Sequence, residues 1–205
     1  MSVALVVMAK EPLPGHTKTR LTPPCSPEQA ARLARASLLD TLEVIARVPA
    51  ARKVLVFDGD GRRWRRAGLE VIPQRGAGLD ERLAAAFDDV GAPALLVGMD
   101  TPQLTAPLLL DGMGALGRPD VDAVLGPALD GGYWSVGFGA GVSGAFADVP
   151  MSSESTCMRQ RARFDELGLR IHEQPPLRDV DTFQDARAVA SVAPDTRFAR
   201  LLAAL

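Results

Sequence analysis

Short runs of apolar, β-branched residues alternate with longer amphipathic segments along the whole of this chain. The first run, 3–9, is continuous and ends at Lys10, which is typical of a strand that is covered on both faces. Similar runs follow at 53–57, 69–72, 94–98, 123–126, 133–137 and 169–173. Strands that alternate with helices at this spacing predict a mainly parallel sheet with helices on both faces, which is a three-layer α/β/α sandwich.

The segments between these runs carry helix signals. Ser26 is placed to cap a helix that has Pro27 at its first position, and Gln29 can complete a capping box. Apolar residues at helical spacing then mark one face as far as Ile45. A small basic helix is predicted around 62–66, and longer helices are predicted at 79–90, 105–116 and near 153–167. Two C-terminal helices are predicted to begin at Thr182 and at Pro194-Asp195.

Length and composition limit the classes of protein that fit. With 205 residues, no repeat and no linker, the sequence predicts one domain, 1–205. No apolar run approaches the roughly 18 residues that a membrane helix needs, and the first run fits a buried strand better than a signal peptide. Cys25 and Cys157 form no zinc or disulfide pattern. We therefore expect a cytoplasmic protein.

The charge balance bears on the expected partners. The net charge of −2 provides no overall field that would draw the chain to nucleic acid or to a membrane surface. Any function that depends on charge must therefore be local, and we expect small molecules as partners. The sequence does not fix the oligomeric state, so a homodimer stays open.

A basic, proline-stiffened loop follows the first run. Between Lys10 and Leu21 it holds Lys10, Lys18 and Arg20 together with Gly15. Lysine and arginine side chains, with backbone N–H groups around a glycine, supply what a polyphosphate needs. The loop is not a Walker A motif. A solvated surface loop is an equally good interpretation of this segment by itself.

Two acidic positions fall where a parallel sheet presents its ligand-binding edge. Asp100 follows the run 94–98, and Asp181 lies in the sequence Asp179-Val180-Asp181-Thr182 just before a predicted helix. Magnesium typically takes one or two carboxylates plus phosphate oxygens, so this pair could hold such an ion. Capping of the following turn or helix is the alternative for each position.

A third polar loop, Asp130-Gly131-Gly132-Tyr133, follows the run 123–126. Paired glycines let the backbone approach a ligand closely, and Asp130 could orient an acceptor hydroxyl or act as a general base. A tight turn between two strands explains the same residues equally well.

These motifs, taken in order, resemble the DUF2064 family. The residues that carry the resemblance are Lys10-x-Pro-x-Pro-Gly-x-x-Lys18-Thr-Arg-Leu, Gly-x-Asp100-x-Pro, Gly126-Pro-Ala-x-Asp130-Gly-Gly-Tyr and Asp179-Val-Asp181-Thr, and the match spans about 3–192. The family is also labelled radical-SAM/selenodomain-associated transferase 1, and some members are named arsenosugar-biosynthesis glycosyltransferases. The resemblance implies the GT-A fold of the nucleotide-diphospho-sugar transferase superfamily.

The resemblance also implies roles for individual residues. It implies a metal (Mg²⁺ or Mn²⁺) at Asp100 and Asp181, and phosphate contacts at Lys18 and Arg20. The Lys-Thr-Arg-Leu segment is similar to phospholactate guanylyltransferases, and Asp-x-Asp-Thr is similar to molybdenum-cofactor-type nucleotidyltransferases. Gln74 and Gly76 lie where such enzymes recognise the nucleobase. Met151 and Ser153 depart from the family pattern, in which an aromatic residue and Thr are common, so the acceptor side of the pocket is less well defined.

The expected activity is group transfer from a nucleotide donor, with Lys18, Asp100 and Asp130 as catalytic residues and Asp130 to Tyr133 contacting the acceptor. Nucleotidyl transfer from a nucleoside triphosphate to a small phosphorylated acceptor is slightly favoured, because the basic loop suits a departing pyrophosphate. Glycosyl transfer from a nucleotide sugar is the alternative that the family naming favours. A non-catalytic nucleotide-binding protein is the second alternative.

Overall fold

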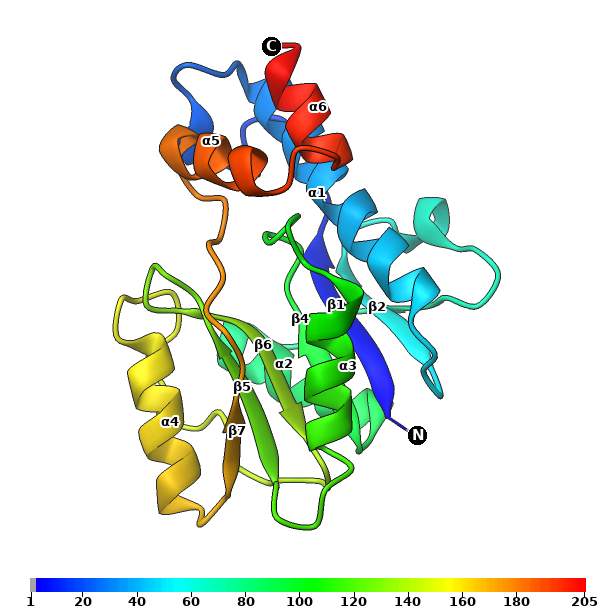
Figure 1. The fold of residues 1–205 in the computed structure, drawn as a ribbon, viewed down its shortest axis with the longest axis vertical. Helices are drawn as coiled ribbons and strands as arrows, with labels where there is room; N and C mark the ends of the chain where they lie inside the picture. The colour runs from blue at the N-terminus through cyan, green and yellow to red at the C-terminus, as the bar shows by residue number, and fades with distance from the viewer. Residues whose placement is uncertain (1–2) are drawn as a thin grey trace.

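A seven-stranded sheet forms the centre of the computed structural model, which describes residues 3–205 (Figure 1). The strand order is β3-β2-β1-β4-β6-β5-β7, and only β6 runs antiparallel to its neighbours. The strands are β1 Ala4–Lys10, β2 Lys53–Asp58, β3 Glu70–Pro73, β4 Ala94–Val97, β5 Ala123–Pro127, β6 Tyr133–Phe138 and β7 Ile171–Glu173. The predicted, mainly parallel sheet is therefore confirmed.

Helices cover both faces of this sheet. They are α1 Pro27–Arg47, α2 Leu79–Val90, α3 Ala106–Ala115, α4 Thr156–Glu166, α5 Phe183–Val192 and α6 Arg197–Ala203, with short 3-10 turns η1 Thr19–Leu21 and η2 Gly61–Trp64. Alternate residues of β1 point to opposite faces, as the strand period requires. Leu5 and Val7 pack with α1 and α3, whereas Val6 and Met8 pack with α2. The three-layer α/β/α sandwich is confirmed.

The C-terminal helices form a smaller apolar cluster of their own. Helices α5 and α6 pack against α1 at one end of the molecule, where Figure 1 shows all three together. Leu33 of α1, Val189 of α5 and Phe198 of α6 are buried in this cluster, which Leu21 also joins. The cluster matters for the site because Asp179 to Thr182 lead directly into α5.

Local signals explain where several helices begin. Ser26 accepts a hydrogen bond from the Gln29 backbone, and the Gln29 side chain accepts from the Ser26 backbone, which is the predicted capping box. Thr182 and Asp185 form a second box at the start of α5. The predicted start of the last helix at Pro194-Asp195 is wrong by a short step, because Thr196 is the N-cap of α6 and accepts from the Ala199 backbone.

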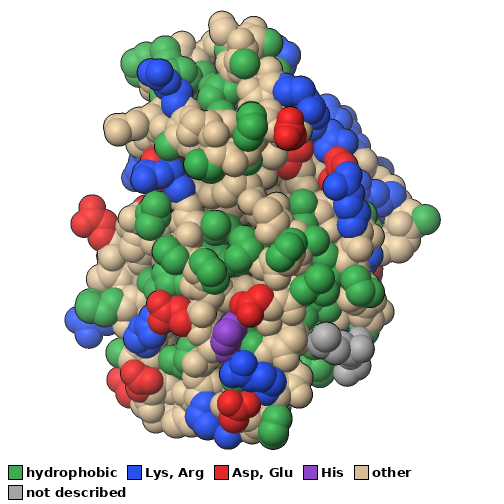
Figure 2. All heavy atoms as spheres, in the orientation of Figure 1, with side chains coloured by type: hydrophobic (Ala, Val, Ile, Leu, Met, Phe, Trp, Pro, Cys, Tyr) green, Lys and Arg blue, Asp and Glu red, His purple; other side chains and the backbone are tan. Residues whose placement is uncertain are grey.

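The surface carries charges of both signs. Figure 2 shows Lys and Arg side chains along the edge over α1, with acidic and basic groups interspersed elsewhere on this face. The basic segment 62–66 begins in η2, where Trp64 packs on Phe57 with ring centroids 5.7 Å apart. Within residues 3–205, no helix is long and apolar enough to cross a membrane.

Candidate active site

Three segments that are far apart in sequence meet beyond the carboxyl ends of β1 and β4. Lys18 Nζ lies 2.9 Å from Asp100 Oδ1 and 3.2 Å from Asp181 Oδ1. Arg20 Nη1 lies 3.7 Å from Asp181 Oδ2 on the solvent side. This group, Lys18 with Asp100 and Asp181, is called the rim cluster below. The structure thus brings together the basic loop and both predicted metal carboxylates.

The backbone of the basic loop directs Lys18 inward. Thr17 is buried and its hydroxyl donates to the Glu11 carbonyl at 3.1 Å, which folds the loop back on itself. Lys18 then adopts a left-handed conformation, with φ 53° and ψ 41°, directly before η1. Non-glycine residues adopt this conformation at some cost in energy. On this backbone path the Lys18 side chain is only 8% exposed.

Charge and burial act in opposite directions on the Lys18 amine. Burial by itself lowers its pKa, but the adjacent carboxylates of Asp100 and Asp181 outweigh that effect, so the pKa lies above its ordinary value. The amine therefore carries a positive charge beside the two carboxylates. The two carboxylates remain open to solvent, with side chains 35% and 38% exposed.

Asp179 is a third acidic side chain at the same place. One of its carboxylate oxygens, Oδ1, is buried and accepts no hydrogen bond from the part of the chain that the structure describes. Burial, followed by repulsion from Asp100 and Asp130, raises the pKa of Asp179 to about 7. Because two cavities share it as a lining residue, Asp179 lies between them.

The donor set of the rim suits a hard divalent cation. Asp100 and Asp181 already converge on one positive charge, and carboxylate oxygens are the ligands that Mg²⁺ and Mn²⁺ prefer. Among residues 3–205, no group of three or more His, Cys, Asp or Glu side chains is arranged to hold an ion. Because Asp100 and Asp181 supply only two side chains, an ion held by them would keep water and phosphate oxygens in the rest of its shell.

Two open cavities adjoin the rim cluster. One has a volume of about 790 Å³ and lies between the basic loop and the loop after β5. It is called the acceptor basin below, after the role predicted from the sequence for Asp130 to Tyr133. Its polar lining includes Lys10, Lys18, Arg20, Asp130 and Ser153. The other, about 390 Å³, runs over the ends of β1 and β4 toward α2, and is called the base groove after the role predicted for Gln74. Gly15 and His16 are exposed and line neither cavity.

In the base groove, Gln74 is held by the backbone. Its side-chain amide donates to the carbonyls of Ala9, at 2.9 Å, and Val56, at 3.3 Å. Its carbonyl oxygen accepts from Arg82 at 3.3 Å. Gly76 has φ +114°, and a Cβ there would approach Glu81 Cβ to 2.7 Å, so this turn requires glycine. The amide nitrogen and the carbonyl oxygen of the Gln74 side chain are therefore both held by partners within the protein.

The loop that contains Asp130 is both a turn and a wall of the acceptor basin. Asp130 Oδ1 accepts from the Gly132 backbone at 2.9 Å, and the chain reverses there between β5 and antiparallel β6. Gly131 has φ +91°, and a Cβ at this position would clash with the backbone carbonyl of Glu154. The tight turn is therefore real, yet Asp130 and Tyr133 also line the basin.

Leu79 and Arg82, one turn apart on α2, were not anticipated as site residues. Both line the base groove, and Arg82 donates to Asp58 and to Gln74. Their i, i+3 spacing directly after Gln74-Arg75-Gly76 is the signal that could have identified them. Asp179 belongs to the Asp179-Val-Asp181-Thr motif, but the sequence predicts no role for it.

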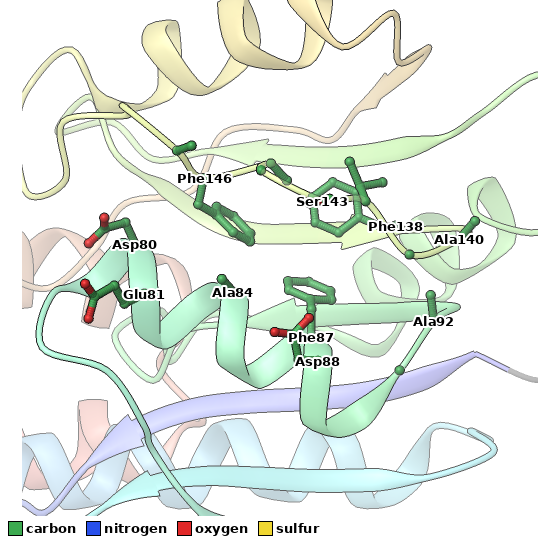
Figure 3. A pocket seen from close by; sticks show the side chains of 16 residues that line it. Asp80, Glu81, Ala84, Phe87, Asp88, Ala92, Phe138, Ala140, Ser143 and Phe146 are labelled. Atoms are coloured by element: carbon green, nitrogen blue, oxygen red, sulfur yellow. The ribbon is translucent and has the colours of Figure 1, made fainter.

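A separate cavity of about 630 Å³ lies away from the rim cluster, between α2 and the loop after β6 (Figure 3). Phe87 and Phe146 stack across it with ring centroids 5.8 Å apart, and Phe138 contacts both. Asp80, Glu81 and Asp88 are its acidic lining residues. Its lining includes no lysine or arginine, so it does not match the polyphosphate chemistry of the rim.

Comparisons with known proteins place the family and the fold of this chain. The model of the DUF2064 family, described as an uncharacterized protein conserved in bacteria, matches residues 41–153. No curated protein matches the chain. A solved structure from Desulfovibrio desulfuricans G20, provisionally named a nucleotide-diphospho-sugar transferase, is similar with a TM-score of 0.89 and 26% identity, over 100% of this chain and 95% of that one.

Two more distant structures share the fold. CMP:2-keto-3-deoxy-manno-octonic acid synthetase, solved with CTP, has a TM-score of 0.59 and 13% identity over 94% of this chain and 99% of that chain. Rv0371C from Mycobacterium tuberculosis H37Rv, solved with manganese, has a TM-score of 0.55 and 16% identity over 93% and 99%. This chain therefore belongs to the DUF2064 family, and its architecture is the nucleotide-diphospho-sugar transferase (GT-A) fold of nucleotidyl- and glycosyltransferases.

Proposed function

We propose that this protein is a divalent-metal-dependent nucleotidyltransferase that moves a nucleoside monophosphate from a nucleoside triphosphate to a small phosphorylated acceptor. One observation carries the proposal: a buried lysine ammonium, two carboxylates and an exposed arginine converge on one point beyond the carboxyl ends of β1 and β4. That is the place where open α/β sheets bind their ligands. A triphosphate needs this combination of fixed cations and carboxylates that can share an ion with it.

In the proposed reaction an oxygen of the acceptor phosphate attacks the α-phosphorus of the triphosphate. The bond between the α-phosphorus and the bridging oxygen to the β-phosphate breaks, and pyrophosphate leaves with both electrons of that bond. Lys18 and Arg20 would stabilise the negative charge that develops on the departing pyrophosphate. A divalent cation at Asp100 and Asp181 would supply further charge neutralisation. The base groove, bounded by Gln74 and Arg82, would hold the nucleobase.

The acceptor basin has features that suit an anionic acceptor. Lys10 and Arg20 are exposed on its wall, where they can attract a phosphorylated molecule. Asp130 also lines the basin, and its Oδ1 accepts from the Gly132 backbone. Its other carboxylate oxygen is therefore the one that could orient an acceptor hydroxyl. Tyr133 also lines the basin; burial raises the pKa of its phenol, which therefore stays protonated and donates to Gln160 Oε1 at 3.3 Å within the protein.

Glycosyl transfer is the second candidate. It is favoured by the similarity, along the full chain, to the structure from Desulfovibrio desulfuricans that is provisionally named a nucleotide-diphospho-sugar transferase. In that reaction an acceptor attacks the sugar carbon, and a nucleoside diphosphate leaves in place of pyrophosphate. The rim cluster would serve both reactions, because the leaving group is a diphosphate in each.

The released product distinguishes the two reactions. We would incubate the purified protein and Mg²⁺ with each nucleoside triphosphate or common nucleotide sugar, together with a panel of phosphorylated and hydroxylated acceptors. Pyrophosphate release supports the nucleotidyl proposal, and nucleoside diphosphate release from a nucleotide sugar supports the second candidate. Saturable nucleotide binding without either product would overturn both and indicate a nucleotide-binding protein.

Matched variants make this assay specific to the rim. Asp181→Asn removes one carboxylate charge of the rim cluster, and Asp120→Asn removes an exposed carboxylate that pairs with Arg118 elsewhere on the surface. We expect Asp181→Asn to lose metal-dependent turnover and Asp120→Asn to retain it. Equal activity of the two variants would remove Asp181 from the proposed site.

A further inference from the structure

The Lys18 ammonium occupies the point on which Asp100 and Asp181 converge. Its Nζ atom lies within hydrogen-bonding distance of both carboxylates, 2.9 and 3.2 Å away. The Lys18 side chain is almost wholly enclosed, whereas the Asp100 and Asp181 side chains are each about a third exposed and line the acceptor basin. A cation therefore already fills the place that the two carboxylates offer.

A divalent ion and this ammonium cannot share the same two oxygens. Two positive charges separated by only a few ångströms repel strongly in a partly enclosed site. The lysine and the two carboxylates also differ in how far each can move. Asp100 is fixed by its backbone, whose carbonyl accepts from Val180 N at 3.0 Å, and Asp181 directly precedes the capping box of α5. Lys18 instead carries its charge on a flexible four-carbon chain, so the lysine is the member that can move.

We propose that Lys18 is an exchangeable internal counter-cation, which neutralises the two carboxylates until a metal ion binds and is then displaced toward the phosphates. This inference rests on the proposed function and adds an order of binding to it. A metal ion alone must displace Lys18 without giving it a new partner, so it binds weakly. A metal with a polyphosphate provides both the ion for the carboxylates and an anion for the lysine.

The proposal therefore requires that metal and polyphosphate each tighten the binding of the other. Binding linkage makes this coupling reciprocal. A permanent structural ion pair makes a different requirement, because its lysine stays on the two carboxylates whatever binds nearby. The two cases differ in whether Lys18 governs the coupling between metal and polyphosphate, and in whether the metal changes the exposure of Lys18.

The first test measures Mn²⁺ affinity by electron paramagnetic resonance, with and without inorganic pyrophosphate as the probe. For the natural protein we expect pyrophosphate to tighten Mn²⁺ binding about tenfold or more, which is within the usual range of coupling between sites. For Lys18→Met we expect Mn²⁺ alone to bind about tenfold more tightly than in the natural protein, and the effect of pyrophosphate to shrink. Unchanged or weaker binding of Mn²⁺ alone by Lys18→Met would overturn the proposal.

Arg20→Met is the matched control for this variant. It also removes one positive charge near Asp181, but Arg20 is 3.7 Å away and its side chain is 77% exposed. We expect it to change the affinity for Mn²⁺ alone much less than Lys18→Met does. An equal change in the two variants would mean that general charge, not displacement of Lys18, sets the affinity, and would also overturn the proposal.

A second measurement uses the unaltered protein, so it does not depend on the folding of a variant. The sequence contains only three lysines, Lys10, Lys18 and Lys53. Lys10 is exposed, whereas Lys18 is enclosed, so an amine-reactive reagent followed by peptide mass spectrometry can report on each. We expect saturating Mn²⁺ to increase labelling of Lys18 several-fold relative to Lys10 and Lys53. Labelling of Lys18 that does not respond to Mn²⁺ would contradict displacement.

These tests separate the inference from the proposed function. Neither uses turnover, a nucleotide or an acceptor. A protein that shows the exchange but releases neither pyrophosphate nor nucleoside diphosphate would retain the inference and lose the proposed activity. A protein that releases pyrophosphate but keeps Lys18 protected from labelling in Mn²⁺ would retain the proposed activity and lose the inference.

Discussion

Two ionic clusters of this molecule contain similar residues but differ in how completely their polar atoms are satisfied. Asp40 on α1 accepts from the backbone N–H groups of Arg197 and Phe198 at 3.0 and 2.9 Å, and the Arg197 guanidinium adds a third contact at 3.4 Å. Every oxygen of this carboxylate is therefore satisfied, and the contacts fix the start of α6. In the rim cluster, the carboxylates face an open basin, and Asp179 nearby has a buried oxygen without a partner.

The difference separates a structural site from a functional one. A saturated network has no capacity left for a ligand, so its energy holds elements together. In an incompletely satisfied network near a cavity, some polar atoms lack a hydrogen-bond partner, and a ligand can supply that partner. Cavity size does not make this distinction, because the cavity of Figure 3 is of comparable volume but contains no such cluster of opposed charges.

The largest expected effect comes from the rim cluster. Asp100→Asn keeps the shape of the side chain but removes the charge that faces Lys18 and the proposed metal. We expect turnover to fall by roughly 10³-fold, a typical loss for a group that stabilises charge in the transition state. Steady-state kinetics would measure this loss, and thermal denaturation would check that the fold persists. A fall of less than tenfold would show that the rim cluster is not the catalytic centre.

The matching change in the saturated cluster should affect stability and not chemistry. Asp40→Ala leaves the first N–H groups of α6 without their acceptor, and the Arg197 guanidinium keeps only its contact with Glu43. Because two backbone N–H groups at the start of α6 lose an acceptor in a buried position, we expect the free energy of unfolding to fall by about 3 kcal/mol. Urea denaturation would measure the change. Turnover measured well below the melting temperature should stay within a few-fold of the natural value, and a selective loss of turnover would contradict the comparison.

Asp179 predicts a stability that depends on pH. Its pKa is raised from 3.8 to about 7, so between these values the folded state holds a proton that the unfolded state has lost. Stability from this group is therefore complete at about pH 4 and declines as the pH rises toward 7. Asp179→Asn removes the decline, so without metal we expect the variant to be more stable at pH 8 by about 4 kcal/mol. Melting temperatures with a chelator at pH 4 and pH 8 test this, with equal differences at both pH values counting against it.

The smallest effect should come from an exposed pair. Asp122 accepts from the Arg170 side chain at 2.7 and 2.9 Å and from its backbone, and these contacts hold the pKa of Asp122 at about 2. Stability from a lowered pKa is present above the ordinary value of 3.8 and is lost as the pH falls toward 2. Asp122→Asn should lower the melting temperature at pH 7 by only about one or two °C. A larger loss would show that surface pairs matter more here than the comparison assumes.

Local patterns predicted most of the elements. Continuous apolar runs identified the central strands, and the capping residues Ser26 and Thr182 located the starts of α1 and α5 within a residue. These signals involve neighbours within one turn, so they can be recognised in the sequence alone. The start of α6 was misplaced because Pro194-Asp195 carries the same kind of signal as Thr196, and only packing on α1 selects between them.

The arrangement of the site required long-range information. Lys18 and Asp181 are 163 positions apart, and no local pattern states that their side chains touch. The family resemblance implied a phosphate contact for Lys18 and a metal contact for Asp181, whereas the structure pairs these two side chains directly. The antiparallel direction of β6 was also not apparent, because a buried run of apolar residues reads the same in either direction.

The dependence of Asp181 on α5 and α6 has a consequence for synthesis on the ribosome. The basic loop and Asp100 leave the exit tunnel early, but the segment that carries Asp181 is positioned by α5 and α6, which follow it in the chain. The nascent protein therefore carries a charged Lys18 with only part of its countercharge until these two helices have left the ribosome. A messenger truncated before α5 should yield a polypeptide that retains most of the sheet but cannot assemble the rim cluster.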